Sequence, residues 1–494
     1  MQNIIILVTI GLLLLLSYII GIKFSPSDKD SKSSFIGASK SFGSVVVALS
    51  TMSAIASGWM LVGMPAVVYS NGNAANLNAM MAVGFALSYI FIGKKVRGIA
   101  ETRQISTIGD LVDARYKDNR VIKFATAFVV FIGTFSYLAA QIGAGASLLE
   151  YLFGWDKFIS SILIFSIVIF YVMKGGESAG IMSQAFQGTI MFIAGVIIIS
   201  MFFYLGGFGK MTSGVLGGGP GNFKHIQLSA FGTASGGMST TYYILGIIGT
   251  VCQPATISRM YAIKNPKEMP KLGLQTGIFQ AVVSFLGFTI GYFAILLVSN
   301  GMLAPISDPA VTAWEVGKYL GFGFQLLLYT AITAAIISSA STYMTLGAQA
   351  FAVDMMSALG VKHTDKEQIS LYQKMIVVVG VVSILVASFG GNAVAVLGSL
   401  GWATFMTIFI PVIVIGFLWK KASIKGVQAA AIVSVIGNIL GLLNDNIFKI
   451  ALPGGIPWTI YLITLTTIIV IVVSLFTYSE KDDVDPLTKA ALEL

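Results

Sequence analysis

Long apolar runs dominate this chain, and a run of about 17–25 apolar residues is long enough to cross a bilayer as a helix. The chain is 56% hydrophobic and 10% charged, whereas a soluble domain carries about 25% charged residues. In lipid, a spanning segment must satisfy its own backbone polar groups, so these runs are expected to be helical. The sequence therefore predicts an all-α membrane protein with about 13 transmembrane helices, over residues 4–22, 41–71, 75–95, 121–152, 157–174, 180–206, 236–263, 270–299, 323–358, 372–389, 393–419, 426–444 and 455–477. The first run has no basic segment before it and no small-residue cleavage site after it, which indicates a retained helix and not a signal peptide.

The 30 Lys and Arg residues are distributed unevenly over the segments between these runs. If the N-terminus lies outside, all but five of them fall on the cytoplasmic side; the five are Lys157, Lys210, Lys224, Lys318 and Lys449. Short cytoplasmic loops carry an excess of Lys and Arg. This distribution predicts a multi-pass protein of the cell membrane with an outside N-terminus and a cytoplasmic C-terminus. The net charge of +9 then reflects topology and does not indicate a nucleic-acid partner.

Several chemistries are excluded by the residues that are scarce. The single cysteine, Cys252, excludes an intramolecular disulfide and a cysteine-based metal cluster. The two histidines, His225 and His363, fall in predicted loops. A membrane-embedded enzyme needs a nucleophile–base pair or a set of metal ligands, and the predicted helices offer neither. We therefore expect a protein that is not an enzyme, whose partners are the lipid bilayer and small molecules, with no obligatory protein partner indicated.

Two of the predicted helices are interrupted by small or helix-breaking residues. The first interruption is SAIASGWMLVGMP at residues 53–65, and the second is LGIIGTVCQP at residues 245–254. If the ten helices from 41 to 419 divide five and five, each interrupted helix is the first of its half. Secondary transporters are often built this way, as inverted repeats whose broken helices bind ion and substrate near the midplane. The predicted parts are an N-terminal helix and cytoplasmic loop (1–40), a first repeat (41–206), an external loop (207–235), a second repeat (236–419), and two further helices with a cytoplasmic tail (420–494).

A cluster of hydroxyls, AAIISSASTYM at residues 334–344, lies in the third helix of the second half. Ser338, Ser341 and Thr342 share one helix face because residues three and four apart are neighbours on a helix. Neutral hydroxyls and freed backbone carbonyls suit a weakly held monovalent cation such as sodium, whereas a divalent ion favours carboxylates. The alternative is that small residues serve helix packing and that the hydroxyls bond to the preceding turn.

Five stretches together resemble the sodium:solute symporter family, which includes bacterial proline, pantothenate, acetate and sialic acid symporters. They are ALSTMSAIASGWMLVGMPAVVYSNG, YLAAQIGAGASLLEYLFG, GGESAGIMSQAFQG, QPATISRMYA and AAIISSASTY. The resemblance implies a LeuT-like core of two inverted five-helix repeats and a sodium ion as the coupling ion. It implies one main sodium site formed by the backbone oxygens of Ser53, Ala56 and Ala335 and the hydroxyls of Ser338 and Ser339. Ile55 and Gln184 stand where some relatives have acidic residues, which favours a single coupling sodium.

For the solute, the resemblance implies contacts on the first, third and sixth core helices. The residues concerned are Ser57, Gly58, Trp59, Tyr137, Gln141, Thr250, Gln253 and Pro254. The YLAAQIGAGASLLEYLFG stretch is similar to acetate and other monocarboxylate carriers, and a helix N-terminus exposed by the break can bind a carboxylate. Gly246 and Thr250 stand where proline transporters carry an aromatic pair, which argues against proline. We therefore expect a sodium-coupled symporter for a small monocarboxylate. The alternative solutes are pantothenate or an amino acid such as proline. The alternative kinds of protein are a proton-coupled carrier or a transporter-like membrane sensor.

Few charged residues fall near the predicted core. Arg259 and Glu177 lie near cytoplasmic helix ends, where we expect them to anchor at the membrane interface. For Asp354, at the inner end of the run 323–358, we expect a solvated or capping role.

Overall fold

The computed structural model describes residues 1–24, 31–37, 40–72, 80–221, 223, 244–389, 394–450, 452–453, 456–479, 484 and 486–493. Within these residues the regular structure is helical, and an isolated bridge between Phe42 and Ile263 is the one strand-like contact. The all-α prediction is therefore confirmed for the described part of the chain.

Long apolar helices make up most of the described chain. Nine are long and apolar enough to cross a membrane, or up to ten if one bent pair of helices counts as a span. Six of the nine are single helices: α1 (Gln2–Lys23), α8 (Arg120–Phe153), α9 (Lys157–Tyr204), α18 (Asp365–Phe389), α21 (Ile424–Leu443) and α22 (Trp458–Thr477). The other three are the longer spans Pro266–Ser299, Phe322–Ala358 and Val396–Leu418, which cover α14 (Met269–Ser299), α16 (Phe322–Gln349) and most of α19 (Val394–Phe409), respectively. The bent pair joins α3 (Ser44–Ile55) to the helix that follows it, η1 (Trp59–Gly63) and α4 (Met64–Asn71).

Shorter helices connect the long ones. They are α2 (Lys32–Phe35), α5 (Met81–Ser88), η3 (Tyr89–Gly93), α6 (Lys94–Thr102), α7 (Ile108–Tyr116), α10 (Gly207–Leu216), α13 (Pro254–Met260), η4 (Pro266–Glu268), η5 (Pro309–Val311), α15 (Thr312–Tyr319), η6 (Ala350–Met355), α17 (Met356–Ala358), η7 (Ile410–Ile415), α20 (Gly416–Leu418), η8 (Asn444–Phe448) and α23 (Pro486–Glu493).

The long helix α9 covers two of the predicted runs, 157–174 and 180–206, and is divided at Gly176. Gly176 has φ 70° and ψ 178°, a conformation that side chains with a Cβ rarely adopt. A Cβ there would also approach the carbonyl oxygen of Phe35 to 2.8 Å. Gly176 lies near α2 at one end of the bundle, whereas Lys157 lines a cavity with Asp308 at the other end. The sequence thus places the division between the two helices correctly.

Two other predicted runs are described only in part. Run 75–95 begins in residues outside the described part of the chain, which resumes at Met80 and continues as α5, η3 and α6. For run 236–263, the description starts at residue 244, and most of the predicted external loop 207–235 also lies outside it. The count of 13 helices therefore stays a prediction.

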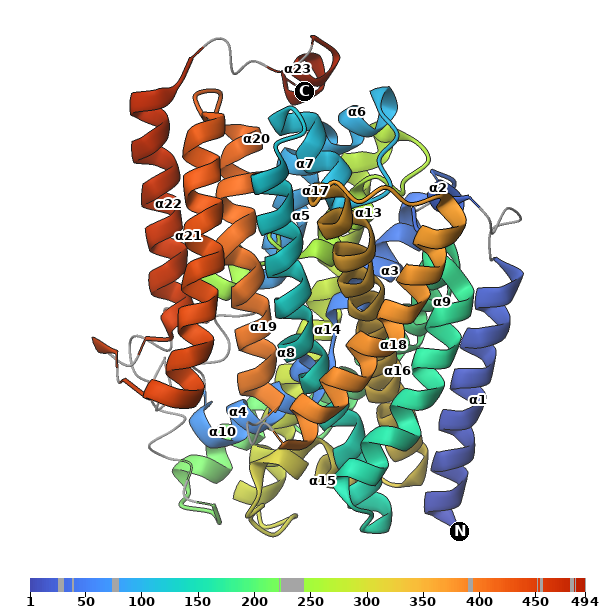
Figure 1. The fold of residues 1–494 in the computed structure, drawn as a ribbon. Helices are drawn as coiled ribbons and strands as arrows, with labels where there is room; N and C mark the ends of the chain where they lie inside the picture. Colours follow the sequence, from blue (N-terminus) through green and yellow to red (C-terminus); the bar gives the residue numbers. More distant parts are fainter. Residues whose placement is uncertain are drawn as a thin grey trace.

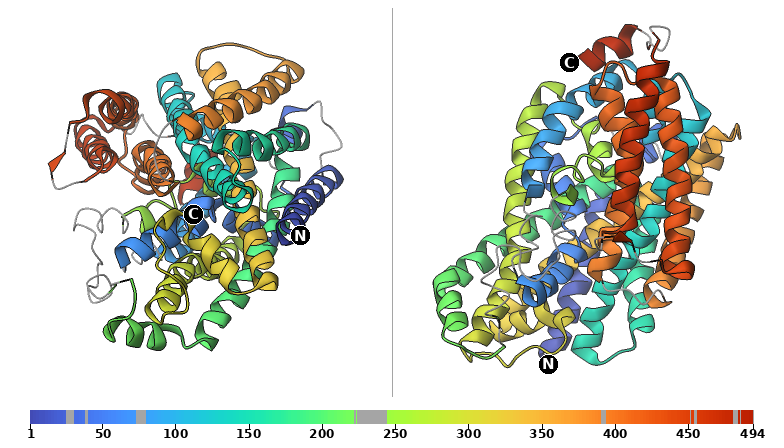
Figure 2. Two further views of the ribbon diagram at one scale, coloured as in Figure 1. Left: turned by 90° about the horizontal axis from the view of Figure 1, so that it is seen from below. Right: turned by 90° about the vertical axis from the view of Figure 1, so that its left-hand side faces the viewer.

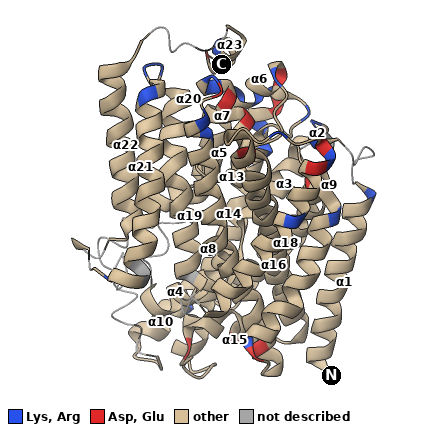
Figure 3. Cartoon of the chain, viewed as in Figure 1, with Lys and Arg blue, Asp and Glu red and all other residues tan. Residues whose placement is uncertain are grey.

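The helices form one elongated bundle with the two termini at opposite ends (Figure 1). The pair α21 and α22 packs at one side, and α1 packs against α9 at the opposite side, as the perpendicular views agree (Figure 2). Between them, α14 is largely buried by its neighbours, whereas α1 and α22 leave most of their surface exposed. Lys and Arg gather at the end where the C-terminus lies (Figure 3). This is the end that the sequence analysis assigns to the cytoplasm.

Candidate functional site

The break that follows α3 is the centre of the candidate site. The helix ends at Ile55 because Ala56 adopts an extended conformation, with φ −66° and ψ 95°. The chain then continues as η1 and α4 at an angle of 58° to α3. The last carbonyls of a helix have no partner within it, so the break leaves the oxygens of Ser53 and Ile55 free to bind groups on other helices.

Three of the five predicted sodium ligands, Ser53, Ala335 and Ser338, are in contact at this break. The Oγ of Ser338 on α16 lies 2.7 Å from the carbonyl oxygen of Ser53 and 3.0 Å from that of Ala335. Ala56 directly follows α3, and Ser339 is the next residue on α16. The structure therefore brings the broken end of α3 against the hydroxyl face of α16, as the resemblance implies.

Three buried hydroxyls in this region, the Oγ atoms of Ser53, Ser57 and Ser339, make no hydrogen bond of good geometry to a described residue. Those of Ser57 and Ser339 lie close to the hydroxyl of Tyr137. Each of these side chains is at most 1% exposed. An unpaired buried hydroxyl carries a desolvation penalty of about 1–3 kcal/mol. Neutral oxygens held in this way, next to the carbonyl of Ser53, fit a monovalent cation, which would satisfy them.

The predicted solute residues of η1 and α8 are in direct contact. The backbone N–H of Gly58 donates to the Oε1 of Gln141 at 2.7 Å, and the Nε2 of Gln141 donates to the carbonyl of Tyr137 at 3.2 Å. A Cβ on Gly58 would lie 2.5 Å from the Cβ of Ala144, so this position requires glycine. The N–H of Gly58 is thus already bonded, and only other groups near the break remain to bind a carboxylate.

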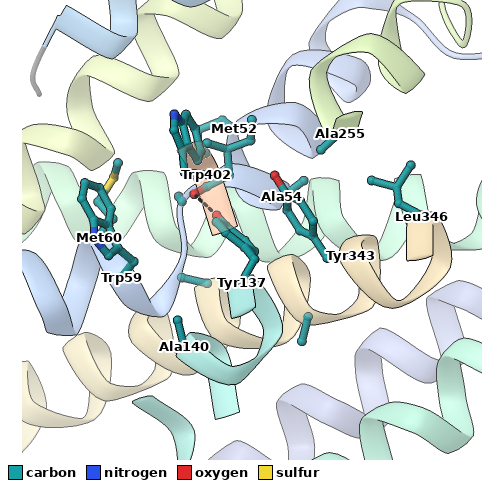
Figure 4. Close-up of a cluster of buried hydrophobic side chains, with 14 of the residues drawn as sticks. Met52, Ala54, Trp59, Met60, Tyr137, Ala140, Ala255, Tyr343, Leu346 and Trp402 are labelled. Atoms are coloured by element: carbon teal, nitrogen blue, oxygen red, sulfur yellow. Dashed lines mark hydrogen bonds between the residues drawn. The ribbon is translucent and has the colours of Figure 1, made fainter. Parts of the chain in front are cut away.

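Four aromatic side chains from four elements surround the break (Figure 4). The ring of Tyr137 lies 4.1 Å from that of Tyr343 and 6.3 Å from that of Trp402, measured between centroids. The hydroxyl of Tyr137 lies 3.4 Å from the carbonyl oxygen of Ile55. Trp59 lies on the other side of Tyr137 and donates its indole N–H to Ser399 at 3.2 Å. Aromatic faces therefore make up much of the surface beside the broken helix.

The second interrupted segment joins the same cluster through Gln253, which immediately precedes α13. The Oε1 of Gln253 accepts from the hydroxyl of Tyr343 at 3.0 Å, and its Nε2 donates to the carbonyl of Gly249 at 3.0 Å. Pro254 occupies the first position of α13, where the missing N–H is tolerated. Both breaks thus contribute to one site.

Thr250 is the predicted solute residue that lies apart. Its hydroxyl donates to the carbonyl of Ile247 at 3.1 Å, and a Cβ added to Gly84 of α5 would collide with it. Thr250 therefore packs toward α5, away from the contact between Gly58 and Gln141.

A cavity of about 650 Å³ lies beside this cluster, toward the end of the bundle where the N-terminus lies. It is lined by residues of η1, α4, α8 and α19, and by Lys157, Asp308 and Pro309. Ser399, which accepts from Trp59, is part of its wall. The volume falls within the range of about 300–1,000 Å³ typical of small-molecule pockets. Trp59 thus connects a residue of the cavity wall to the segment that follows the break.

The family model for the sodium:solute symporters matches residues 35–434 of this chain. The chain belongs to the sodium:solute symporter family. Its curated relatives include the osmoregulated proline transporter OpuE of Bacillus subtilis (strain 168), 27% identical over 437 residues that cover 87% of each chain. A sodium/proline symporter of Staphylococcus aureus (strain JH9) is 28% identical over 425 residues, which cover 82% of this chain and 80% of that protein.

Solved structures show the fold of the symporter. A Na⁺-coupled sialic acid symporter in a substrate-bound outward-open state matches with a TM-score of 0.72 and 17% identity, covering 97% of this chain and 98% of that one. Mhp1, a transporter of the nucleobase-cation-symport-1 family, matches with a TM-score of 0.53 and 12% identity, covering 90% and 97%. The predicted LeuT-like fold is confirmed. Family and fold are those of transporters and not of enzymes.

Three charged residues of the symporter are buried in the structure. Arg259 and Glu177 do not anchor at the interface: their side chains are 0% and 5% exposed, and they form an ion pair with each other. For Asp354 the solvated alternative is wrong, because its side chain is buried. It accepts from the Oγ1 of Thr107 at 2.6 Å and from the N–H of Gly109 at 3.1 Å, at the start of α7, which agrees with the capping alternative. The available signal was that Arg259 lies inside a predicted span, where an ionisable residue must find a partner.

Proposed function

We propose that this protein is a sodium-coupled symporter that takes up a small zwitterionic amino acid, proline or a close relative of it, by alternating access. The observation that carries the proposal is the meeting of the Ser53 carbonyl with Ser338, beside the unpaired hydroxyls of Ser53, Ser57 and Ser339. Membership of a family of sodium symporters supports sodium as the coupling ion. The proline transporters among the relatives favour proline as the solute over the monocarboxylate that the sequence alone suggested.

The proposed sodium ligands are the carbonyl oxygens of Ser53, Ala56 and Ala335 and the hydroxyls of Ser338 and Ser339. All are neutral, so a bound ion contributes one uncompensated positive charge beside the solute. A carboxylate of the solute would lower the energy of that charge. Sodium and solute then favour each other's binding, which is the thermodynamic basis of coupling. With Ile55 and Gln184 in place of acidic residues, we propose one sodium per solute.

The proposed solute site lies on the other side of the break, between the sodium ligands and the cavity of about 650 Å³. Its residues are Ser57, Gly58, Trp59, Tyr137, Gln141, Gln253 and Pro254. Thr250, which packs toward α5, is left out of the proposed site. The side chains of the proposed site are uncharged, which suits a solute whose own charges cancel. Gly246 and Thr250 leave this segment without an aromatic pair, but Tyr343 and Trp402 lie close to Tyr137. These rings offer faces for a pyrrolidine ring, a role that a monocarboxylate does not require.

The same proposal includes the topology. The two repeats would cover 41–206 and 236–419, and the end that carries the C-terminus and most Lys and Arg would face the cytoplasm (Figure 3). The large cavity then opens toward the outside, and uptake would proceed from that cavity past Trp59.

The test is uptake into proteoliposomes containing the purified full-length protein under an inward sodium gradient, with an equal potassium gradient as the control. The panel is proline, acetate, pyruvate, pantothenate and sialic acid. Sodium-dependent accumulation of proline supports the proposal. Sodium-dependent accumulation of a monocarboxylate alone would refute the assignment of the solute but leave sodium as the coupling ion. Accumulation without sodium dependence would refute the ion assignment.

A further inference from the structure

Arg259 is the most deeply buried cation near the candidate site. Its side chain is 0% exposed, and its Nη1 pairs with the Oε1 of Glu177, the first residue after the division of α9 at Gly176. Removing one partner from a buried ion pair is strongly destabilising, because the remaining charge is left uncompensated. The two side chains therefore hold α13 and the second part of α9 together.

The guanidinium also joins two further elements. Its Nε lies 3.2 Å from the Oγ of Ser50 on α3, and its Nη2 donates to the Oε1 of Gln184 on α9 at 2.7 Å. Ser50 in turn lies 2.9 Å from the same Gln184 oxygen. The two broken helices, α3 and α13, are thus fastened to α9 through one charged group.

From Gln184 a chain of hydrogen bonds leads to the proposed sodium site. Its Nε2 donates to the Oγ1 of Thr342 at 2.7 Å and lies 3.3 Å from the Oγ of Ser341. Both hydroxyls bond to the carbonyl of Ser338 at 2.9 Å. Ser338 is also the residue whose hydroxyl contacts the Ser53 carbonyl. The ion pair and the sodium ligands therefore belong to one continuous polar network.

The other side of the ion pair faces a small cavity between α1, α9 and α16. The cavity has a volume of about 20 Å³, room for about one water molecule. Its walls include Glu177, Gln184, Ser341 and Thr345. Along α3, Ser50 lies one helical turn nearer than Ser53 to the end of the bundle where the C-terminus lies. The ion pair thus lies between the sodium ligands and that end.

We propose that the Arg259–Glu177 ion pair is a latch that keeps the cytoplasmic side of the transporter closed. The hydrogen bonds through Gln184 and Thr342 connect the latch to the occupancy of the sodium site. Opening a path toward the cytoplasm between α3, α13, α9 and α16 requires this pair to separate in each cycle. The inference rests on the proposed function for its direction, whereas the closure itself can be measured without transport.

The experiment uses the full-length protein with Cys252→Ala, which removes the one native cysteine. Thr345→Cys serves as the reporter, because Thr345 lines the small cavity and is 6% exposed. The rate of labelling by a thiol reagent is measured in potassium and in sodium, with and without Glu177→Gln. The matched control is Glu101→Gln, since Glu101 also pairs with an arginine, Arg97, but within α6 and with its side chain 49% exposed.

The expected result is that Glu177→Gln raises the labelling rate about tenfold or more in potassium, which corresponds to about 1.4 kcal/mol in the closing equilibrium. We also expect it to weaken protection by sodium, whereas Glu101→Gln leaves both rates unchanged. Equal labelling of the parent and Glu177→Gln in potassium overturns the latch. The latch is also overturned if Glu101→Gln raises the labelling rate in potassium as much as Glu177→Gln does.

If Glu177→Gln does not yield folded protein, the paired variant Glu177→Gln with Arg259→Gln removes both charges and leaves no buried charge unpaired. Labelling of this variant at the parent rate overturns the latch, and faster labelling supports it. Thermal stabilisation of the parent protein by sodium, compared with potassium, tests the proposed function independently of this inference. If sodium and potassium stabilise the parent equally against heat, the sodium assignment fails, while the potassium arm still tests the latch.

Discussion

Replacing Ser339 by alanine is expected to change the stability of the sodium-free protein and its affinity for sodium in opposite directions. The Oγ of Ser339 is buried and makes no hydrogen bond of good geometry to a described residue. Without sodium, this hydroxyl is a source of instability, and with sodium it is a proposed ligand. We therefore expect Ser339→Ala to stabilise the sodium-free protein and to weaken sodium binding.

The adjacent Ser338 supplies the matched comparison. Its hydroxyl contacts the carbonyls of Ser53 and Ala335 at 2.7 Å and 3.0 Å, so Ser338→Ala leaves at least one buried carbonyl unpaired. A typical internal hydrogen bond contributes about 0.5–1.5 kcal/mol net, and we expect a loss of that size in sodium-free stability. For Ser339→Ala, the relief of an unpaired buried hydroxyl gives a gain of about 1 kcal/mol, the lower end of the desolvation penalty. Without sodium, Ser338→Ala should therefore lower the free energy of unfolding, whereas Ser339→Ala should raise it.

With sodium, both variants should lose binding. At a sodium concentration of 100 times the Kd, binding stabilises the folded state by about 2.7 kcal/mol. If the loss of one ligand weakens binding tenfold, the same concentration stabilises by about 1.4 kcal/mol. The sodium concentration needed to reach a given stabilisation would rise about tenfold.

The assay is thermal unfolding of the purified protein across a sodium titration at constant ionic strength, with potassium as the replacement ion. The reasoning is refuted if Ser339→Ala lowers sodium-free stability as Ser338→Ala does, because the hydroxyl would then have a structural partner. If each sodium concentration stabilises Ser339→Ala and the parent by the same amount, Ser339 is not part of the ion site.

Two further substitutions test the solute side of the site. Gly58→Ala places a Cβ 2.5 Å from the Cβ of Ala144; we expect overpacking to lower stability by about 1–3 kcal/mol and uptake to fall at least about tenfold. In contrast, Gly43→Ala, at the N-cap of α3 before the break and with no atom within 4 Å of the added carbon, should leave uptake unchanged, and equal uptake by the two variants would contradict the packing argument. Tyr343→Phe removes the hydroxyl that donates to Gln253 at 3.0 Å, so thermal unfolding should show a loss of about 1–3 kcal/mol and uptake kinetics a raised KM. A variant with parental stability and KM would show that this hydrogen bond does not organise the site.

The helical architecture follows from the sequence because apolar length and the absence of charge are local properties. The division of α9 was predictable from Gly175 and Gly176, which separate two apolar runs. The break after α3 was predictable from the small residues and glycines at 53–65. Interruptions of this kind fix where a helix ends, but they do not fix which neighbour fills the gap. The angle of 58° between α3 and the following helix depends on packing against α8 and α16, and no local pattern encodes it.

The candidate site shows the same limit at the level of single side chains. The spacing of Ser338, Ser341 and Thr342 correctly places them on one face of α16, but it does not distinguish the proposed ion ligand from the two hydroxyls that bond to the carbonyl of Ser338. That distinction arises from Gln184, which is more than 150 positions away in the chain and bonds to Thr342 at 2.7 Å. Arg259 was misplaced for the same reason, since a charge near a helix end is ordinarily solvated unless a distant carboxylate reaches it. Buried charges at such a site depend on partners that only the tertiary structure brings together, and in this transporter those partners connect the two broken helices to the proposed sodium ligands.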